Sequence, residues 1–323
     1  MKVLVTGAAG FLGSHLTEKL VELGNEVRVL VHYDSNNNWG WLENSKYKDS
    51  IEFVVGDIRD FDSVFSSMKG IHEVYHLAAL IGIPYSYLSP LAYIKTNIEG
   101  TYNILQSARQ LGTENIMITS TSETYGSAQY VPMDEEHPKV GQSPYSATKI
   151  GADNLAVSFY KSFGLPIKIV RPFNIYGPRQ SARAIIPTIC VQVLNDVKKI
   201  KLGNLSAKRD LTFVNDTVKG FLEISKQNKF NGESVNIGMN EEVSIQELVE
   251  MISKITKKNI QIEVDEERVR PSKSEVDRLK CNNNKLLNNT NWKPDYSLKE
   301  GLTETIEWIE QNKKLFKHNI YNR

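Results

Sequence analysis

Tyr145 and Lys149 are the two residues whose types and spacing most directly suggest acid–base chemistry. On a helix, side chains four residues apart share one face. An ammonium beside a phenol, together with a cationic cofactor, stabilises the tyrosinate, so we expect the pKa of Tyr145 to be lowered towards neutrality. Such a tyrosine can remove a hydroxyl proton while a hydride leaves the same carbon. The spacing also occurs often by chance, so its weight depends on the residues around it.

A second reactive segment, STSETYG, comes shortly before this pair and follows a predicted strand. Thr121 can hydrogen-bond the same substrate hydroxyl, and Ser122 adds another hydroxyl beside it. Glu123 is the informative residue, because alcohol oxidation alone gives a carboxylate no task here. An elimination does, since the proton next to a newly formed ketone is acidic and needs a base. The alternative is that Glu123 is a salt-bridge partner.

The start of the chain predicts a dinucleotide site. The segment TGAAGFLG joins a β-branched run to a leucine repeat of helical spacing. Glycine lets the backbone approach a pyrophosphate, and a helix N-terminus supplies free N–H donors and a positive dipole. The glycine pattern is weak alone and much stronger at a strand–helix junction. The residues expected to bind the cofactor are Gly7, Gly10, Phe11, Leu12, Gly13, Asp34, Asp57, Ile58, Leu77, Ala78, Ala79, Asn97, Tyr145 and Lys149.

The choice between NAD and NADP is expected to depend on residues after the second strand. Asp34 can bind the ribose hydroxyls if the strand runs on, but it is equally an ordinary loop aspartate. This stretch contains no arginine to hold a 2′-phosphate, although His32 could help. Asp57 ends the third strand, where its carboxylate can accept a hydrogen bond from adenine. We therefore expect NAD, with NADP as the alternative.

Polar residues in the second half of the chain suit a phosphorylated substrate. Arg209 and Arg270 can pair with two phosphates, because guanidinium geometry matches phosphate oxygens. Arg179 and Arg183 fall on a loop expected to cover the substrate, and Asn174 can hydrogen-bond it. For each arginine the alternative is an ordinary surface salt bridge.

Strands and helices that alternate regularly are needed to bring these residues together. Apolar runs at 2–6, 26–31, 51–55, 74–77, 116–119 and 167–171 are separated by helical patterns such as 93–111 and 145–163. This alternation predicts a Rossmann-type, doubly wound parallel sheet, followed by a smaller, mainly helical C-terminal substrate lobe. We expect residues 1–172 plus about 208–240 to form the dinucleotide-binding part. Residues of about 173–207 plus 241–323 are expected to form the substrate lobe.

The bulk properties exclude several classes of protein. The chain has 323 residues with 39 basic and 38 acidic side chains, so no polyanionic partner such as a nucleic acid is expected. Two isolated cysteines are too few for a disulfide framework or a metal site. No apolar run is long enough to span a bilayer, and the first residues already form a strand. We therefore expect a cytoplasmic protein that uses neither a membrane nor a metal.

The sequence resembles the extended short-chain dehydrogenase/reductase family over nearly the whole chain. The resemblance rests on TGAAGFLG, Gly56-Asp57, HLAA at 76–79, Asn97, the Thr121/Tyr145/Lys149 set, RPFNIYGP at 171–178 and Arg209-Asp210. The family's 4-epimerases usually carry a small or hydroxyl residue at the Glu123 position, whereas its 4,6-dehydratases and UDP-glucuronate decarboxylases carry Glu. The resemblance therefore implies a nucleotide-sugar 4,6-dehydratase. It also implies a homodimer or dimer of dimers formed by helices 93–111 and 145–163.

Two segments, ALIGIPYSY at 79–87 and RPSKSEV at 270–276, resemble the dehydratases that begin bacterial legionaminic acid synthesis. This similarity implies GDP-N-acetylglucosamine as substrate, with UDP-N-acetylglucosamine as the alternative. Glucose-type dehydratases have an aspartate where this chain has Ser122, which leaves open the group that protonates the departing hydroxyl. UDP-glucuronate decarboxylation, with Arg183 near the carboxylate, and 4-epimerisation remain alternatives. A non-catalytic NAD sensor is disfavoured by the intact set of Thr121, Tyr145 and Lys149.

Overall fold

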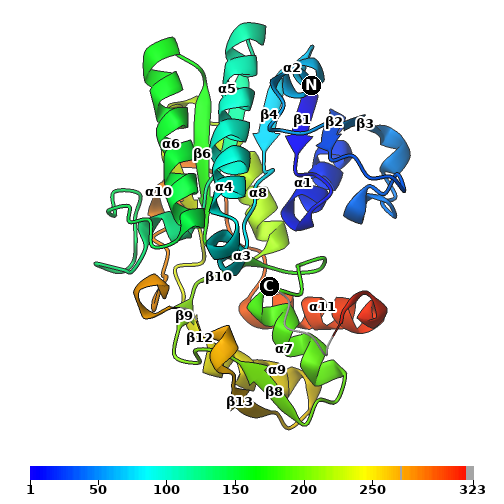
Figure 1. Cartoon of the computed structure of the whole chain (residues 1–323), viewed down its shortest axis with the longest axis vertical. Coiled ribbons are helices and arrows are strands. Elements are labelled where there is room, and N and C mark those ends of the chain that lie inside the picture. Colours follow the sequence, from blue (N-terminus) through cyan, green and yellow to red (C-terminus); the bar gives the residue numbers. More distant parts are fainter. Residues whose placement is uncertain (270, 318–323) are drawn as a thin grey trace.

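The computed structural model describes residues 1–269 and 271–317 and is built around a seven-stranded sheet (Figure 1). The strands lie in the order β11 (Ser234–Ile237), β6 (Ile167–Pro172), β5 (Asn115–Thr119), β4 (Glu73–His76), β1 (Lys2–Thr6), β2 (Glu26–Val31) and β3 (Ile51–Val55). Every neighbouring pair is parallel. The central strands are apolar on both faces because helices cover both. The predicted fold class is confirmed.

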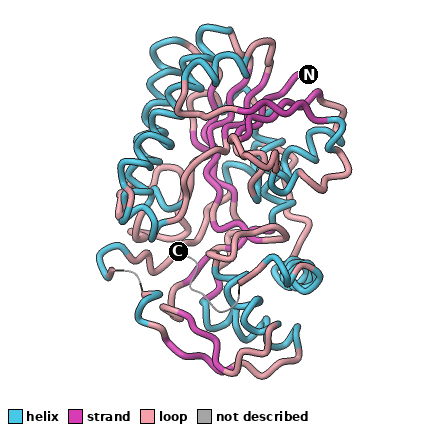
Figure 2. The backbone as a smooth tube through the Cα atoms, turned by 45° about the vertical axis from the view of Figure 1, so that its right-hand side comes forward, coloured by secondary structure: helices cyan, strands magenta, loops and turns pink. Residues whose placement is uncertain are grey.

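The helices divide between the two faces of this sheet. Helices α1 (Phe11–Glu22) and α8 (Val214–Ser225) share one apolar cluster with the strands, to which Leu16 and Phe221 belong. Helices α2 (Phe61–Met68), α5 (Gly100–Leu111) and α6 (Pro144–Phe163) share a second cluster on the opposite face. Figure 2 shows the strands side by side with helices around them.

Helix α6 carries Tyr145 and Lys149, and local sequence determines where it begins. Ser143 and Ser146 form a reciprocal capping box, and Pro144 occupies the first turn, where its missing N–H costs nothing. The helix ends at Gly164 in the left-handed conformation. The cap fixes the first turn of α6, so it also fixes the position of Tyr145.

The helix predicted at 93–111 is interrupted. It consists of α4 (Pro90–Tyr93), a π-helical segment (Ile94–Glu99) and α5, and it follows a short helix α3 (Ile83–Leu88). The wide π turn contains Asn97, whose side-chain amide donates to Leu80 O and Thr148 Oγ1 and accepts from Leu80 N. Local widening of this kind often occurs at functional sites.

The remaining elements form a second, lower group in Figure 1. Its short strands pair two by two: β7 (Asn174–Tyr176) with β10 (Leu211–Phe213), β9 (Lys208–Arg209) with β12 (Val243–Ser244), and β8 (Lys199–Leu202) with β13 (Gln261–Val264). Helices α7 (Ile185–Leu194), α9 (Ile245–Thr256) and α11 (Leu298–Gln311) enclose a separate core. The chain then returns to the sheet, because Leu286 of α10 (Asn284–Asn289) and Trp292 pack into the α1/α8 cluster.

Two further findings concern membrane insertion and the cysteines. No helix in the described part of the chain is long and apolar enough to cross a membrane. Both cysteines, Cys190 and Cys281, are buried as free thiols, and burial raises the pKa of each, so neither is a ready nucleophile.

Candidate active site

The candidate site lies at the carboxyl ends of the parallel strands, where the strand order reverses between β1 and β4. In open α/β sheets a crevice for ligands forms at this point. Gly7 follows β1 and Leu77 follows β4, so the glycine loop and the HLAA segment flank the reversal. The segment that carries Thr121 and Glu123 follows β5, the next strand along the sheet.

The glycine loop packs closely against neighbouring backbone and leaves N–H groups free at the start of α1. Gly7 has φ +72°, and a Cβ there would lie 2.7 Å from Ala78 N. A Cβ at Gly13 would lie 2.1 Å from Gly7 O, which explains why only glycine lets α1 pack here. Gly10 caps α1 without any side-chain hydrogen bond, so the first-turn N–H groups remain available to an anion. The loop therefore fits the pyrophosphate of a dinucleotide.

The other residues predicted to line the cofactor surround this loop. Phe11 and Leu12 are half-buried at the start of α1, and the HLAA residues that follow β4 are half-buried too. Ile58 is buried against Gly100 of α5. Sequence reasoning missed Gly40, which has φ +60° and packs on the loop, with its Cβ position 2.5 Å from Ala9 O.

The two candidate aspartates are both engaged by nearby groups. Asp34 lies beyond the end of β2 and accepts a hydrogen bond from Asn36 N at 2.7 Å. Asp57 accepts from Arg59 Nε at 3.0 Å with each carboxylate oxygen, and this contact lowers the Asp57 pKa. Any adenine contact of Asp57 therefore involves a carboxylate already paired with a guanidinium.

The predicted catalytic residues come together. Tyr145 is buried in the first turn of α6, with the Tyr93 ring edge-on at 6.2 Å and a hydrogen-bonding interaction with Thr121. Thr121 caps the short turn Ser122–Tyr125, in which Ser122 is buried and Glu123 is half-buried. The Glu123 carboxylate is close enough to act electrostatically on Tyr145. Within residues 1–269 and 271–317 it makes no ion pair, so the salt-bridge alternative is not realised there.

The protein's own groups raise the pKa of Tyr145, whereas the expected lowering also depends on the charge of a cofactor. Burial raises the pKa of Tyr145, and the charge of Glu123 raises it further, although the contact with Thr121 opposes both. Lys149 Nζ donates to Thr119 O, and burial lowers the pKa of Lys149 to about 8. Desolvation therefore dominates at both residues, because burial disfavours the charged form of each.

The predicted substrate residues are placed less uniformly. Asn174 Oδ1 is buried and has no hydrogen-bond partner within the described chain. Arg183 is exposed, and its charge reaches Tyr93. Arg179, at φ +70°, instead pairs with Glu18 of α1 at 3.0 Å, so it has the salt-bridge role. Arg209 contacts Glu275 at 3.3 Å. Arg270 lies outside the described residues.

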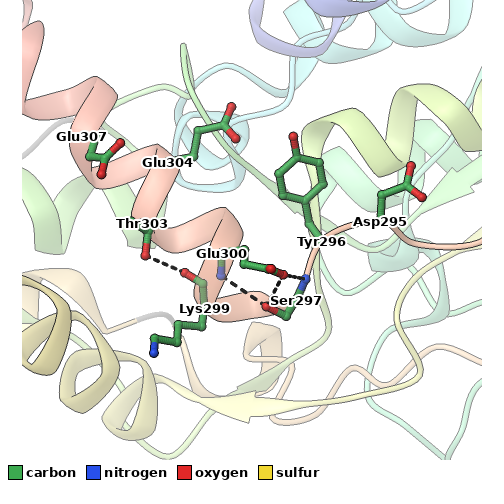
Figure 3. Close-up of a pocket in the computed structure, with 8 residues that line it drawn as sticks. All are labelled: Asp295, Tyr296, Ser297, Lys299, Glu300, Thr303, Glu304 and Glu307. Carbon is green, nitrogen blue, oxygen red and sulfur yellow. Dashed lines mark hydrogen bonds between the residues drawn. The ribbon is translucent and has the colours of Figure 1, made fainter.

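A separate groove runs along α11 (Figure 3) and does not belong to this site. Its lining residues are Asp295, Tyr296, Ser297, Lys299, Glu300, Thr303, Glu304 and Glu307. The excess of carboxylates disfavours a phosphorylated ligand. Among the residues with described positions, no cluster of His, Cys, Asp and Glu suited to a metal is present.

The fold and the site together define an enzyme class. A doubly wound sheet places a dinucleotide cradle beside a Tyr/Lys pair, a threonine and a carboxylate, and this combination defines the nicotinamide-dependent enzymes that modify nucleotide sugars. The chain belongs to the family described as GDP-mannose 4,6 dehydratase, whose sequence model matches residues 4–305. That family comprises NAD-dependent nucleotide-sugar dehydratases, decarboxylases and epimerases.

Relatives with each of these three chemistries are similar to the chain. It is 31% identical to a putative UDP-glucose 4-epimerase of Methanocaldococcus jannaschii, over 97% of this chain and 99% of the relative. It is 32% identical to the UDP-N-acetyl-alpha-D-glucosaminuronate decarboxylase of Bacillus cytotoxicus, over 96% and 98% of the two chains. The structure of the dTDP-glucose 4,6-dehydratase DesIV from Streptomyces venezuelae, which contains NAD, superposes with a TM-score of 0.87 at 27% identity, covering 98% and 99%.

Proposed function

We propose that the protein is a nucleotide-sugar 4,6-dehydratase that uses NAD and acts on GDP- or UDP-N-acetylglucosamine. The finer similarity to the dehydratases of legionaminic acid synthesis favours the GDP sugar. The glycine loop fits NAD, because Gly7 and Gly13 let the loop pack closely against the segment after β4 and against the start of α1, whose first-turn N–H groups have no side-chain cap and can bind the pyrophosphate. When bound, NAD would supply reversible hydride acceptance, so that the hydride from carbon 4 of the sugar could return at carbon 6.

The residues of the chain move the protons. Tyr145, hydrogen-bonded by Thr121, removes the proton of the carbon-4 hydroxyl, and Lys149 supplies positive charge near the tyrosinate. Because burial and the charge of Glu123 raise the Tyr145 pKa, we assign its lowering to the positive charge of the bound cofactor together with that of Lys149. Glu123 then removes the acidic proton from carbon 5, and the hydroxyl leaves carbon 6 as water. When a hydride returns to carbon 6, carbon 5 takes up a proton, which balances the proton that Tyr145 removed from the carbon-4 hydroxyl. Ser122 is not an acid of useful strength, so we assign protonation of that hydroxyl to Glu123 as well.

The observation that supports dehydration is the state of Glu123. Glu123 is a half-buried residue whose charge acts on Tyr145, yet it forms no ion pair in the part of the chain that the structure describes. A structural carboxylate in such a place would normally be paired, because burying a lone charge is costly. Oxidation and re-reduction at carbon 4, as in an epimerase, do not require this carboxylate. Removal of the carbon-5 proton in a dehydration does require a base, and Glu123 can serve as that base.

A second candidate is decarboxylation of UDP-glucuronate. It requires a cation near the carbon-6 carboxylate, and Arg183 is a suitable group because its charge reaches Tyr93, which contacts Tyr145. In this reaction the carbon-4 ketone makes loss of carbon dioxide from carbon 5 favourable. Glu123 would then not need to remove the carbon-5 proton.

Product analysis distinguishes these reactions. Purified protein is incubated with GDP-N-acetylglucosamine, UDP-N-acetylglucosamine and UDP-glucuronate in turn, beside Glu123→Gln, and the products are identified by mass spectrometry. Loss of one water from an N-acetylglucosamine nucleotide, abolished in the variant, supports the proposal. Release of carbon dioxide from UDP-glucuronate, or an isomer of unchanged mass, contradicts it.

We also propose that the protein is a dimer formed through α5 and α6. Along these elements Tyr93 and Leu105 are buried within the subunit, whereas Ile94 is 47% exposed. Further exposed apolar residues are Leu91 of α4, Tyr102 of α5, and Tyr160 and Phe163 of α6. Exposed apolar groups of this kind are typical of subunit interfaces. Sedimentation analysis tests the dimer directly.

A further inference from the structure

A buried ion pair lies directly behind the proposed reaction centre. Asp153 of α6 and Arg171 of β6 are joined at 2.7 Å, and both side chains are fully shielded from solvent. Asp153 is one helical turn beyond Lys149, so the two side chains share a face of α6. The proposed mechanism assigns neither residue a role.

The pair holds both ends of the segment that carries Thr121 and Glu123. At one end, Ser120 Oγ donates to Asp153 Oδ2 at 2.8 Å. At the other end, Tyr125 Oη accepts from Arg171 Nη1 at 2.8 Å. Between them lie Thr121 and Glu123, so the segment cannot shift without disturbing the ion pair. The same carboxylate therefore links this segment to the helix that carries Tyr145 and Lys149.

Asp153 also acts on the charge of Lys149. Burial lowers the Lys149 pKa to about 8, and the Asp153 carboxylate opposes that change. The histidine facing Lys149, His76 of β4, cannot contribute a charge, since burial lowers its pKa to about 3. Lys139 lies near the ion pair and interacts with both Asp153 and Arg171. The second oxygen of Asp153, Oδ1, is buried without a hydrogen-bond partner among residues of described position.

From this geometry we infer that Asp153 is a positioning residue of the active site. Its carboxylate ties the helix bearing Tyr145 and Lys149 to the segment bearing Thr121 and Glu123, and it supplies the counter-charge for the Lys149 ammonium. Stability alone does not explain such a pair, because buried ion pairs can often be replaced by apolar residues of similar volume without loss. The inference rests on the proposed role of Tyr145 and Lys149, which dehydration, epimerisation and decarboxylation share, and not on the role of Glu123.

The test is the pH profile of kcat for Asp153→Asn, which keeps the shape of the side chain and removes its charge. The Asp153 charge raises the pKa of both Tyr145 and Lys149, so its loss moves both limbs of the bell-shaped profile to lower pH, by about one unit. We expect kcat at neutral pH to fall about tenfold or more while KM changes little. Asp153→Glu should restore the position of the limbs, because it restores the charge.

Glu73→Gln is a matched control at the opposite end of the same sheet. Glu73 is a buried carboxylate beside Lys168, a buried lysine whose pKa is also lowered to about 8. This variant should change stability without moving the pH profile. An Asp153→Asn enzyme that keeps the wild-type profile and loses only stability, as Glu73→Gln does, overturns the inference.

Two further measurements keep the test decisive. If Asp153→Asn does not fold, Ser120→Ala removes one bond to the carboxylate without removing charge, and it should lower kcat with little effect on KM. If no nucleotide sugar reduces the bound cofactor, the proposed function fails, and the inference is then tested by NMR titration of isotope-labelled lysine, with Lys149 assigned from Lys149→Met. In that case an unchanged Lys149 pKa in Asp153→Asn, or a Lys149 pKa in Asp153→Glu that is lowered as far as in Asp153→Asn, contradicts the inference.

Discussion

The carboxylate of Glu123 raises the pKa of the Tyr145 phenol, so the proposed base for carbon 5 opposes ionisation of the proposed base for the carbon-4 hydroxyl. The two groups come from different elements, Glu123 from the turn after β5 and Tyr145 from the first turn of α6. Their proximity means that the two proton transfers are electrostatically coupled. Replacing one carboxylate should therefore affect the oxidation and the elimination in opposite directions.

Glu123→Gln is expected to lower formation of the dehydrated product by about 100-fold or more, because the amide cannot accept the carbon-5 proton. Oxidation at carbon 4 should persist, and its rise with pH should shift to lower pH because a charge that raised the Tyr145 pKa is gone. Single-turnover absorbance of bound NADH, followed against pH, measures the oxidation separately from the product. An oxidation step lost together with the product would mean that Glu123 acts on Tyr145 and not on carbon 5.

Gly7→Ala should weaken both folding and cofactor retention. Its φ of +72° strains any side chain, and its Cβ would lie 2.7 Å from Ala78 N. Gly24→Ala is the matched control, since φ is +81° there and nothing lies within 4 Å. We expect Gly7→Ala to lose about 1–3 kcal/mol more unfolding free energy than Gly24→Ala, because only the former overpacks. Urea unfolding and the NAD content after gel filtration check this, and equal losses in the two variants would contradict the close-approach argument.

Much of the fold followed from the sequence because the parallel sheet is built from local signals. Residues close together in the sequence determine the strand Lys2–Thr6, the glycine turn after it and the capped start of α6. The short pairs β8/β13 and β9/β12 were not predicted, because each strand depends on a partner distant in the chain. The π turn at Asn97 was missed for a similar reason, since that side chain bonds Leu80 and Thr148 outside its own helical segment.

Within the site, sequence reasoning located the reactive side chains but not their electrostatics. The spacing of Tyr145 and Lys149 placed them on one face, yet only the structure shows that burial raises one pKa and lowers the other. The ion-pair partners of the arginines could not be predicted either. Arg179 pairs with Glu18, which is distant in the sequence, and the residues around them give no indication of this contact. Asp153 carried no signal beyond its helical spacing from Lys149.

His76 gives the protein a predictable sensitivity to acid. It is fully buried, with its ring nitrogens 2.8 Å from Thr6 Oγ1 and 3.2 Å from Thr101 Oγ1, and burial lowers its pKa from 6.5 to about 3. The unfolded chain binds this proton below about pH 6.5, whereas the folded chain binds it only near pH 3. The stabilisation is therefore complete above pH 6.5 and is lost as the pH falls through that window.

His76→Gln should flatten this dependence while keeping a side chain that can hydrogen-bond both threonines. Between about pH 6 and pH 4, the wild type is expected to lose about 1.4 kcal/mol more unfolding free energy per pH unit than the variant. Urea unfolding at several pH values in that range measures both slopes. Parallel slopes would show that His76 is not the group responsible.

The contact between Arg209 and Glu275 should control nucleotide binding, if Arg209 binds the diphosphate as expected from the sequence. The two side chains are 3.3 Å apart and largely buried, and Arg209 also donates to Lys208 O. A diphosphate has to compete with Glu275 for the guanidinium, so Glu275→Gln should bind UDP and GDP roughly tenfold more tightly, or about 1.4 kcal/mol. Arg209→Gln should bind them at least about tenfold more weakly, because a charge-assisted contact is lost.

Calorimetric titration with UDP and GDP measures both effects, and uridine and guanosine provide the ligand control. Neither variant should change nucleoside affinity, because these ligands lack the phosphates that Arg209 would contact. Weaker nucleotide binding by Glu275→Gln would show that Glu275 orients Arg209 and does not compete for it. Equal effects on nucleotides and nucleosides would place Arg209 away from the diphosphate, and the arginine would then be a structural link between β9 and the 271–276 segment.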